Sequence, residues 1–261
     1  MVKTIKEVAP HAQEGSLLMD ITSIKKEASE ALEKYAPENV EILPCHPMFG
    51  PRVSTLEGQI IILTPIENRS KRWFPRVTAY LEKSECEIVL TTPQEHDKTM
   101  AIVQGLTHFS YINLASTIRK LNVDVKKSRL FASPTYSLML DMISGLAFQN
   151  PYLYYTIQKS NKETSNVRET LIKEGIYLSE LIENGDEEDF VKIMIESARY
   201  LNENEEGLGR LDKTIDILTH QADYLKKSIN EEVGLQHIYT KKSICGNTKG
   251  NNFTVNSIGR Q

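Results

Sequence analysis

Residues 40–65 read VEILPCHPMFGPRVSTLEGQIIILTP, and this stretch decides the fold. The short apolar runs at its two ends, residues 40–43 and 59–65, are typical of strands buried on both faces. Two further runs, SLLMDIT at 16–22 and CEIVLTT at 86–92, have the same character. The sequence therefore predicts four short strands of a parallel sheet.

Between these strands, apolar residues recur at the spacing of a helix. It appears in SIKKEASEALEKYAP at 23–37 and in ENRSKRWFPRVTAYLEKSE at 67–85. Strands that alternate with helices through short connections form a doubly wound sheet. We therefore expect residues 1–92 to form a partial Rossmann-like parallel sheet, the C-terminal half of a nucleotide-binding domain.

From Pro93 onward, long helical periods replace the strand pattern. Apolar residues recur on most faces of QEHDKTMAIVQGLTHFSYINLASTIRKL at 94–121 and of SPTYSLMLDMISGLAFQNPYLYYTIQ at 133–158. A helix that is apolar on most faces must be buried on most faces. We therefore expect an all-α domain over 93–229 that pairs with a second copy as a homodimer, and a polar tail over 230–261.

Composition and charge exclude several classes of protein. The chain has 261 residues, of which 40% are hydrophobic and 25% charged, as in soluble globular proteins. Its formal net charge of -4 gives no basic footprint for nucleic acid. The odd set Cys45, Cys86 and Cys245 has no CxxC spacing, which fits a reducing compartment. No apolar run is long enough to cross a bilayer. We expect a cytoplasmic protein with no nucleic-acid or membrane partner.

The loop CHPMFGP at 45–51 is the most informative candidate for chemistry. It places His46 directly after a buried strand, at the edge where parallel α/β sheets bind their ligands. An imidazole there can accept a proton or a hydrogen bond from a substrate hydroxyl near neutral pH. The alternative is a loop histidine bonded to backbone, and the residues alone leave both interpretations open.

Other polar residues lie near that edge or in the first apolar helix. Ser23 follows the preceding strand, although it also suits the N-cap of the next helix. His108 lies in an apolar helix, where a lone histidine is more often a satisfied core residue. His96 and Asp97 begin the same helix and are interpreted as its cap. Arg52 is a candidate for binding a carboxylate through its planar guanidinium.

Several common motifs are absent from these 261 residues. There is no GxGxxG and no GxxxxGK[ST], so the sequence lacks the usual cradle for a pyrophosphate. The histidines and carboxylates show no HExxH or comparable spacing, and we therefore expect no metal site.

Six segments together resemble the archaeal branch of the prephenate dehydrogenase family. They occur in order between residues 3 and 228 as EGSLLMDITSIK, LPCHPMFGP, QIIILTP, EHDKTMAIVQGLTHF, ASPTYSLML and QNPYLY. The resemblance implies a Rossmann domain for NAD or NADP, followed by a helical dimerisation domain. It also implies oxidative decarboxylation of prephenate to 4-hydroxyphenylpyruvate in tyrosine biosynthesis.

The resemblance assigns roles to individual residues. His46 matches the catalytic histidine that hydrogen-bonds the ring hydroxyl of prephenate, and Ser23 matches a serine between nicotinamide and substrate. Thr22 and Ser23 are the expected cofactor contacts. His108 matches a histidine in the substrate pocket, and Arg52 is expected to bind prephenate or a related small carboxylate.

The sequence departs from the family in three places. Relative to the family, it begins after the first half of the Rossmann domain. Gly145 occupies the position of an arginine that binds a substrate carboxylate, and the tail after Asn230 resembles only a degraded regulatory domain. We expect the isolated chain to bind NAD or NADP weakly, if at all. The alternative function is a catalytically inactive, truncated paralogue that acts only as a dimerising or ligand-sensing protein.

Overall fold

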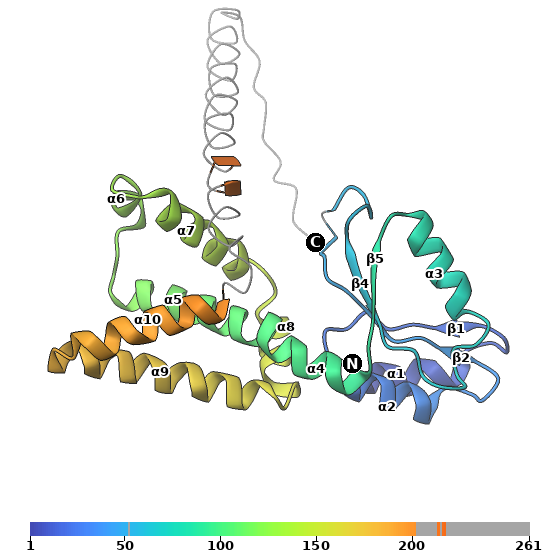
Figure 1. The fold of residues 1–261 in the computed structure, drawn as a ribbon. Coiled ribbons are helices and arrows are strands. Elements are labelled where there is room, and N and C mark those ends of the chain that lie inside the picture. The colour runs from blue at the N-terminus through green and yellow to red at the C-terminus, as the bar shows by residue number, and fades with distance from the viewer. Residues whose placement is uncertain (52, 202–212, 215, 218–261) are drawn as a thin grey trace, which may run out of the picture. The chain divides into compact units, whose positions relative to one another are not determined.

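The computed structural model describes residues 1–51, 53–201, 213–214 and 216–217 (Figure 1). Residues Met1–Phe131 and Ser137–Phe190 form one compact unit, which contains both cavities considered below. The described residues 132–136 and 191–201 belong to a second unit. Arg52, Cys245, most of the helix expected around 210–229, and the tail at 230–261 lie outside the described residues.

The first part of the chain alternates short strands with helices. In chain order its elements are α1 (Val2–Val8), η1 (Ala9–His11), β1 (Leu17–Leu18), α2 (Lys26–Tyr35), β2 (Glu41–Ile42), β3 (Cys45–Pro47), β4 (Ile60–Leu63), α3 (Phe74–Lys83) and β5 (Glu87–Leu90). The expected fold class, a partial Rossmann-like sheet followed by helices, is confirmed.

One strand runs against the expected direction. β1 pairs with β2 and β4 pairs with β5, both in parallel, but β3 pairs with β4 in antiparallel register, with His46 opposite Ile62. The prediction of an entirely parallel sheet is therefore wrong at β3. A parallel partner usually requires a helical crossover, and the described residues between 48 and 59, all but residue 52, contain no helix. Pro44, which has no N–H, separates β2 from β3.

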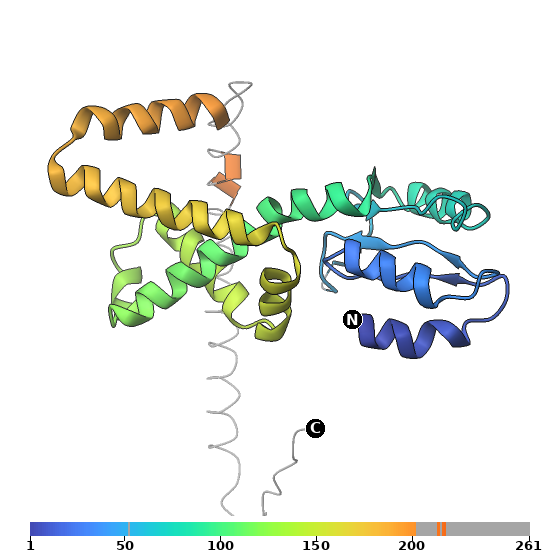
Figure 2. The same cartoon turned by 90° about the horizontal axis from the view of Figure 1, so that it is seen from below.

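Apolar cores lie on both faces of the strands. Leu43 packs with Leu63 and with Leu81 of α3, whereas its neighbour Ile42 packs with Leu32 of α2. Figure 2 shows α3 on one side of the strands and α1 and α2 on the other. Successive side chains of a strand point to opposite faces, so one extended segment supplies both cores and is fixed from two sides.

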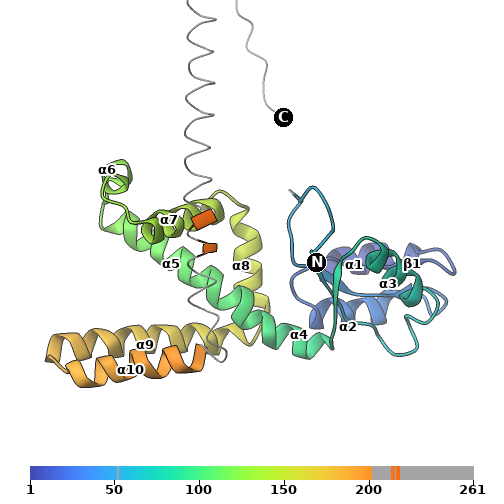
Figure 3. The same cartoon turned by 45° about the horizontal axis from the view of Figure 1, so that its top comes forward.

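The rest of the described chain is helical. Its elements are α4 (Pro93–Met100), η2 (Ala101–Leu106), α5 (Thr107–Lys120), α6 (Val125–Arg129), α7 (Pro134–Ala147), α8 (Pro151–Ser160), α9 (Thr164–Asn184) and α10 (Glu187–Leu201). The helix predicted at 94–121 is one continuous run through α4, η2 and α5 (Figure 3). The break at Asn150 is real, because its side chain accepts a bond from Tyr152 N and begins α8.

The middle of that long helix, η2, is a π-helix. There α9 crosses it closely, and a Cβ added to Gly105 would lie 2.7 Å from Thr164 Cγ2 (Figure 2). Gln158 Nε2 donates to the Gly105 carbonyl at 2.8 Å. Glycine at 105 therefore permits this close approach of α9. π-Helical segments of this kind are frequent at functional sites.

No helix in the described part of the chain combines the length and the apolarity needed to cross a membrane.

Candidate functional site

A cavity of about 720 Å³ lies where the β1–α2 loop, β3 and the long helix meet. The loop contributes Thr22 and Ser23, β3 contributes His46, and the helix contributes Gln104 and His108. The α7–α8 connection and α8 complete the wall with Gln149, Asn150, Tyr152, Leu153, Tyr154, Thr156 and Ile157. The cavity thus brings together Thr22, Ser23, His46 and His108, which the sequence had singled out.

His46 lies inside β3 and is only 3% exposed. Its Nδ1 lies 2.9 Å from His96 Nε2, and its Nε2 lies 3.3 Å from Gln104 Nε2. Both ring nitrogens therefore face side chains, so the interpretation as a backbone-bonded loop histidine is wrong. Burial, followed by the neighbouring His96 and Lys25, lowers the pKa of His46 from 6.5 to about 3. The imidazole is neutral near pH 7 and can accept a proton.

His96 and Asp97 do not cap their own helix, contrary to the sequence interpretation. Thr92 is the N-cap of α4 and accepts from Glu95 N at 3.2 Å. Asp97 instead accepts bonds from the backbone N–H of Lys25 and Lys26 at 2.7 and 3.0 Å, at the start of α2.

This contact also decides the role of Ser23 at the start of α2. The N-cap position is Lys25, and it makes no side-chain cap. The backbone amides of Lys25 and Lys26 donate instead to the side chain of Asp97 in α4, which lies far away in sequence. The interpretation of Ser23 as the N-cap is therefore wrong, and its side chain lines the cavity instead.

The carboxylate of Asp97 is held in its charged form. Burial alone would raise its pKa, but hydrogen bonds from His96 and from the Lys25 and Lys26 amides bring the pKa below its usual value. His96 Nδ1 lies 2.8 Å from Asp97 Oδ1, and His96 is 1% exposed. An Asp–His pair therefore stands directly behind His46.

A buried ion pair supports the loop that carries Thr22 and Ser23. Lys25 Nζ donates to Asp20 Oδ1 and, at 2.5 Å, to the Cys45 carbonyl. Thr22 Oγ1 also donates to Asp20 Oδ1, at 2.6 Å. Burial lowers the pKa of Lys25, while the Asp20 charge opposes that shift. The pair ties the loop to the start of β3, beside His46.

Cys45 belongs to this supporting structure rather than to the chemistry. Its side chain is 3% exposed, and Sγ lies 3.1 Å from the Asp20 carbonyl. Burial raises the pKa of the Cys45 thiol to about 11. A protonated, buried thiol is a poor nucleophile.

Two polar atoms in the cavity wall are buried without a partner among the described residues: Gln104 Oε1 and His108 Nδ1. The His108 ring contacts Tyr154 edge-on, with 4.8 Å between ring centroids. His108 is therefore not the satisfied core residue that its position in an apolar helix suggested. Buried polar atoms in native proteins nearly always have partners, so these two atoms are candidate contacts for a polar ligand.

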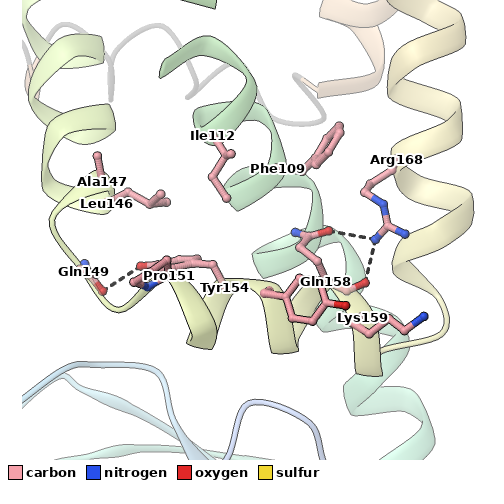
Figure 4. A pocket seen from close by; sticks show the side chains of 11 residues that line it. Phe109, Ile112, Leu146, Ala147, Gln149, Pro151, Tyr154, Gln158, Lys159 and Arg168 are labelled. Carbon is pink, nitrogen blue, oxygen red and sulfur yellow. Dashed lines mark hydrogen bonds between the residues drawn. The ribbon is translucent and has the colours of Figure 1, made fainter. Parts of the chain in front are cut away.

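A second cavity, of about 510 Å³, also has Tyr154 in its wall (Figure 4). Its wall is mostly apolar, with Phe109, Ile112 and Leu146 among its residues. Tyr154 and Gln149 line both cavities, and the Tyr154 hydroxyl donates to Gln149 Oε1 at 2.8 Å.

The polar edge of this second cavity is formed by Arg168, which is held in place by its neighbours. Arg168 Nη1 donates to the Gln158 carbonyl at 2.8 Å and to Gln158 Oε1 at 3.0 Å. These bonds appear in Figure 4.

Sequence reasoning missed Gln104, Gln149 and Tyr154 in the cavity and the role of His96 and Asp97 behind it. One signal was present: Gln104 and His108 are four residues apart in an almost uncharged helix, and such positions share a face. Gly145 lies in α7, and an added Cβ would meet no atom within 4 Å there. Among the described residues, no group of three or more His, Cys, Asp or Glu side chains could hold a metal ion.

Two family models match consecutive parts of the sequence. The model described as "Prephenate dehydrogenase, nucleotide-binding domain" matches residues 1–90. The model described as "Prephenate dehydrogenase, dimerization domain" matches residues 92–196. Together they cover the α/β part and most of the described helices.

Individual proteins agree with this result. A "Probable arogenate/prephenate dehydrogenase" from Methanocaldococcus jannaschii is 45% identical over 238 residues, which cover 90% of this chain and 53% of the relative. A "T-protein" from Haemophilus influenzae is 28% identical and is matched over 73% of this chain and 49% of its own length. The chain thus spans about half the length of these curated relatives.

A solved structure shares the fold. The prephenate dehydrogenase from Aquifex aeolicus, in complex with hydroxyphenyl propionate and NAD+, superposes with a TM-score of 0.62 at 22% identity. The superposition covers 77% of this chain and 72% of that one.

Proposed function

Because this chain belongs to the prephenate dehydrogenase family, we propose that it forms the substrate-facing half of an NAD(P)-dependent oxidative decarboxylation of prephenate or arogenate. In this proposal His46 accepts the proton of the substrate's ring hydroxyl. His108 and Arg52 bind the substrate, and Thr22 and Ser23 lie against the nicotinamide. The proposed domains are residues 1–92, 93–229 and 230–261.

The observation that carries the proposal is the environment of His46. The His46 ring is buried in the wall of the cavity, and because burial lowers its pKa the imidazole is neutral near pH 7, so that one nitrogen keeps a lone pair that can accept a hydrogen bond or a proton. The unpartnered Gln104 Oε1 and His108 Nδ1 supply further polar contacts for a ligand.

The residues can assist each bond change in turn. A bound nicotinamide supplies the hydride acceptor. As the hydride leaves the hydroxyl-bearing carbon, His46 Nε2 takes up the hydroxyl proton and thereby favours the developing carbonyl. The bond to the departing carbon dioxide then gives its electron pair to the ring, which becomes aromatic, and the proton returns from His46 to the phenolic oxygen.

The residues present fit one end of the cofactor. Thr22 and Ser23 line the cavity beside His46, and the loop that carries them is fixed by the Lys25–Asp20 pair. The sequence contains no GxGxxG turn for the pyrophosphate. The proposal therefore assigns only the nicotinamide end of NAD or NADP to these residues.

The substrate's carboxylates need cationic partners. Among the described residues that line the cavity there is no lysine or arginine. Arg52 is the proposed carboxylate contact, because it follows Pro51, which lines the cavity.

A homodimer is the proposed assembly. Leu130, Phe131 and Phe148 are each more than 80% exposed, and they lie in the helical part of the chain. Several large apolar side chains this exposed make the helical part a candidate interface. A second copy of the chain is the proposed cover, as the match to a dimerization-domain model supports.

The test is an absorbance assay for NADH or NADPH with prephenate or arogenate as substrate. The chain is assayed alone and after co-expression with the N-terminal half of the Methanocaldococcus jannaschii relative, with titration calorimetry of both nucleotides. We expect the chain alone to bind either nucleotide weakly, if at all, and the combined preparation to recover some turnover, with substrate binding weakened by Gly145. His46→Gln should lower kcat roughly 100- to 10,000-fold, whereas exposed His11→Gln should not change it.

The outcomes separate the candidate functions. Turnover that survives His46→Gln would remove the proposed role of His46. A folded combined preparation that binds nucleotide but turns over neither substrate would favour the dimerising or ligand-sensing alternative.

A further inference from the structure

A line of hydrogen bonds connects the start of α2 to the cavity. The backbone N–H groups of Lys25 and Lys26 donate to Asp97 at 2.7 and 3.0 Å. Asp97 Oδ1 lies 2.8 Å from His96 Nδ1, and His96 Nε2 lies 2.9 Å from His46 Nδ1. The line joins three elements, α2, α4 and β3, and every side chain in it is buried.

The donor and the acceptor of each hydrogen bond in this line follow from the charge of the Asp97 carboxylate. Asp97 is ionised and receives two backbone N–H groups, so it can only accept. His96 Nδ1 must then carry a hydrogen and donate it to Asp97. In a neutral His96 the other nitrogen, Nε2, has no hydrogen, so His46 Nδ1 must be the donor between the two rings.

We propose that His96 and Asp97 are positioning residues that fix His46 in the tautomer with its hydrogen on Nδ1, which leaves Nε2 as an acceptor facing the cavity. This inference rests on the proposed function, because it explains how His46 is kept ready to take a proton. Gln104 is consistent with it, since its side-chain amide nitrogen is the atom that faces His46 Nε2, at 3.3 Å.

The arrangement also has a consequence for the protonated form of His46. When Nε2 takes the substrate's proton, the ring becomes a cation whose Nδ1–H still points at His96 Nε2. The Asp97 carboxylate behind His96 then stabilises that cation through one intervening ring. A similar arrangement orients and stabilises the catalytic histidine in Ser–His–Asp hydrolases. There is one alternative: a His96 that is itself a cation would donate to His46 Nδ1 and leave a hydrogen on His46 Nε2.

Nitrogen NMR distinguishes these two forms without any need for turnover. The full chain is labelled with ¹⁵N-histidine, the His46 signals are assigned with His46→Gln, and long-range proton–nitrogen correlations are recorded between pH 6 and 8. We expect a protonated, pyrrole-type Nδ1 and an unprotonated, pyridine-type Nε2 for His46. A hydrogen on His46 Nε2 would overturn the proposal.

Two substitutions at position 96 test the cause. In His96→Leu the acceptor is lost, and we expect His46 to exchange between both tautomers. In His96→Gln the amide oxygen can accept from His46 Nδ1, and we expect the tautomer to be retained. An unchanged His46 tautomer in a folded His96→Leu chain would show that His96 does not set it. His11→Gln is the control, and circular dichroism reports folding.

Activity provides a second readout where the combined preparation turns over substrate. His96→Leu should lower kcat roughly 100-fold or more while changing KM little, and His96→Gln should recover part of that loss. Equal losses in the two variants would indicate a merely structural role for His96. Because the NMR result does not depend on catalysis, failure of this inference and failure of the proposed function can be told apart.

Discussion

Helices α2 and α5 have similar mixtures of apolar and polar residues but are buried very differently. α2 has ten residues and buries Ala28, Ser29, Ala31 and Leu32, the last of which packs with Ile42 of β2. α5 has fourteen residues, and none of them is buried. The α/β part therefore buries apolar side chains within one chain, whereas the helical part presents apolar surface that a single chain does not cover.

The first test of this comparison is the stability that the buried Lys25–Asp20 ion pair gives to the α/β part. Lys25→Met removes the cation of a fully buried ion pair and leaves the Asp20 charge without its partner. Breaking one side of such a pair costs about 3–5 kcal/mol, so we expect the free energy of unfolding in urea to fall by that amount. Lys26→Met, one residue away and exposed, is the matched control.

A second substitution shows whether the lone charge is the cause. Adding Asp20→Asn to Lys25→Met removes that charge while the Asn oxygen can still accept from Thr22. We expect the double variant to recover a large part of the stability. If Lys25→Met lowers the free energy of unfolding no more than Lys26→Met does, the buried Lys25–Asp20 pair does not stabilise the α/β part.

The buried histidine of the same region predicts how stability depends on pH. The pKa of His46 is about 3 in the folded chain and near 6.5 when the imidazole is free in solution. Between these values the unfolded chain binds a proton that the folded chain does not bind. The free energy of unfolding should therefore fall as pH drops from about 6.5 towards 3, with a slope of up to about 1.4 kcal/mol per pH unit.

Urea unfolding across that pH range measures this effect. The groups that face His46 are His96, Lys25 and Asp97, and all three are unchanged in His46→Gln. That variant should show a shallower dependence, with the part due to other groups remaining. A profile identical to that of the unsubstituted chain would mean that His46 is protonated in both states or in neither.

The smallest effect on unfolding is expected in the helical part. Phe131→Ser and Phe148→Ser change side chains that are 82% and 92% exposed, so each should alter the free energy of folding of one chain by less than about 0.5 kcal/mol. Their effect should appear in association instead. Sedimentation equilibrium should show a dimer dissociation constant at least about tenfold higher, which corresponds to about 1.4 kcal/mol.

The control for this pair lies in the α/β part. Val8 on α1 is also exposed, at 56%, and Val8→Ser should leave the dimer unchanged. If the unsubstituted chain is a monomer at micromolar concentration, the explanation offered for the exposed helical surface is wrong.

Sequence patterns located most elements because burial of a strand or a helix leaves a local period. They could not predict the direction of β3, which depends on how residues 48–59 return the chain to β4. They also could not predict that Asp97 accepts hydrogen bonds from the backbone amides at the start of α2, because that contact joins residues more than seventy positions apart. Local spacing suggests which residues are buried, whereas partners across the fold depend on how the elements pack.

The π-helical turn at Ala101–Leu106 changes the angle about the helix axis between the side chains before it and those that follow. In a regular α-helix, positions 96 and 104 would be rotated by about 80° relative to each other. The wider turn reduces that angle, which is how both side chains reach the same imidazole ring. Loss of a single codon here would restore an ordinary helix in which the same two side chains, then seven positions apart, differ by only about 20°. The π-helical turn thus accommodates one residue more than an ordinary helix while both side chains stay on the face that meets His46.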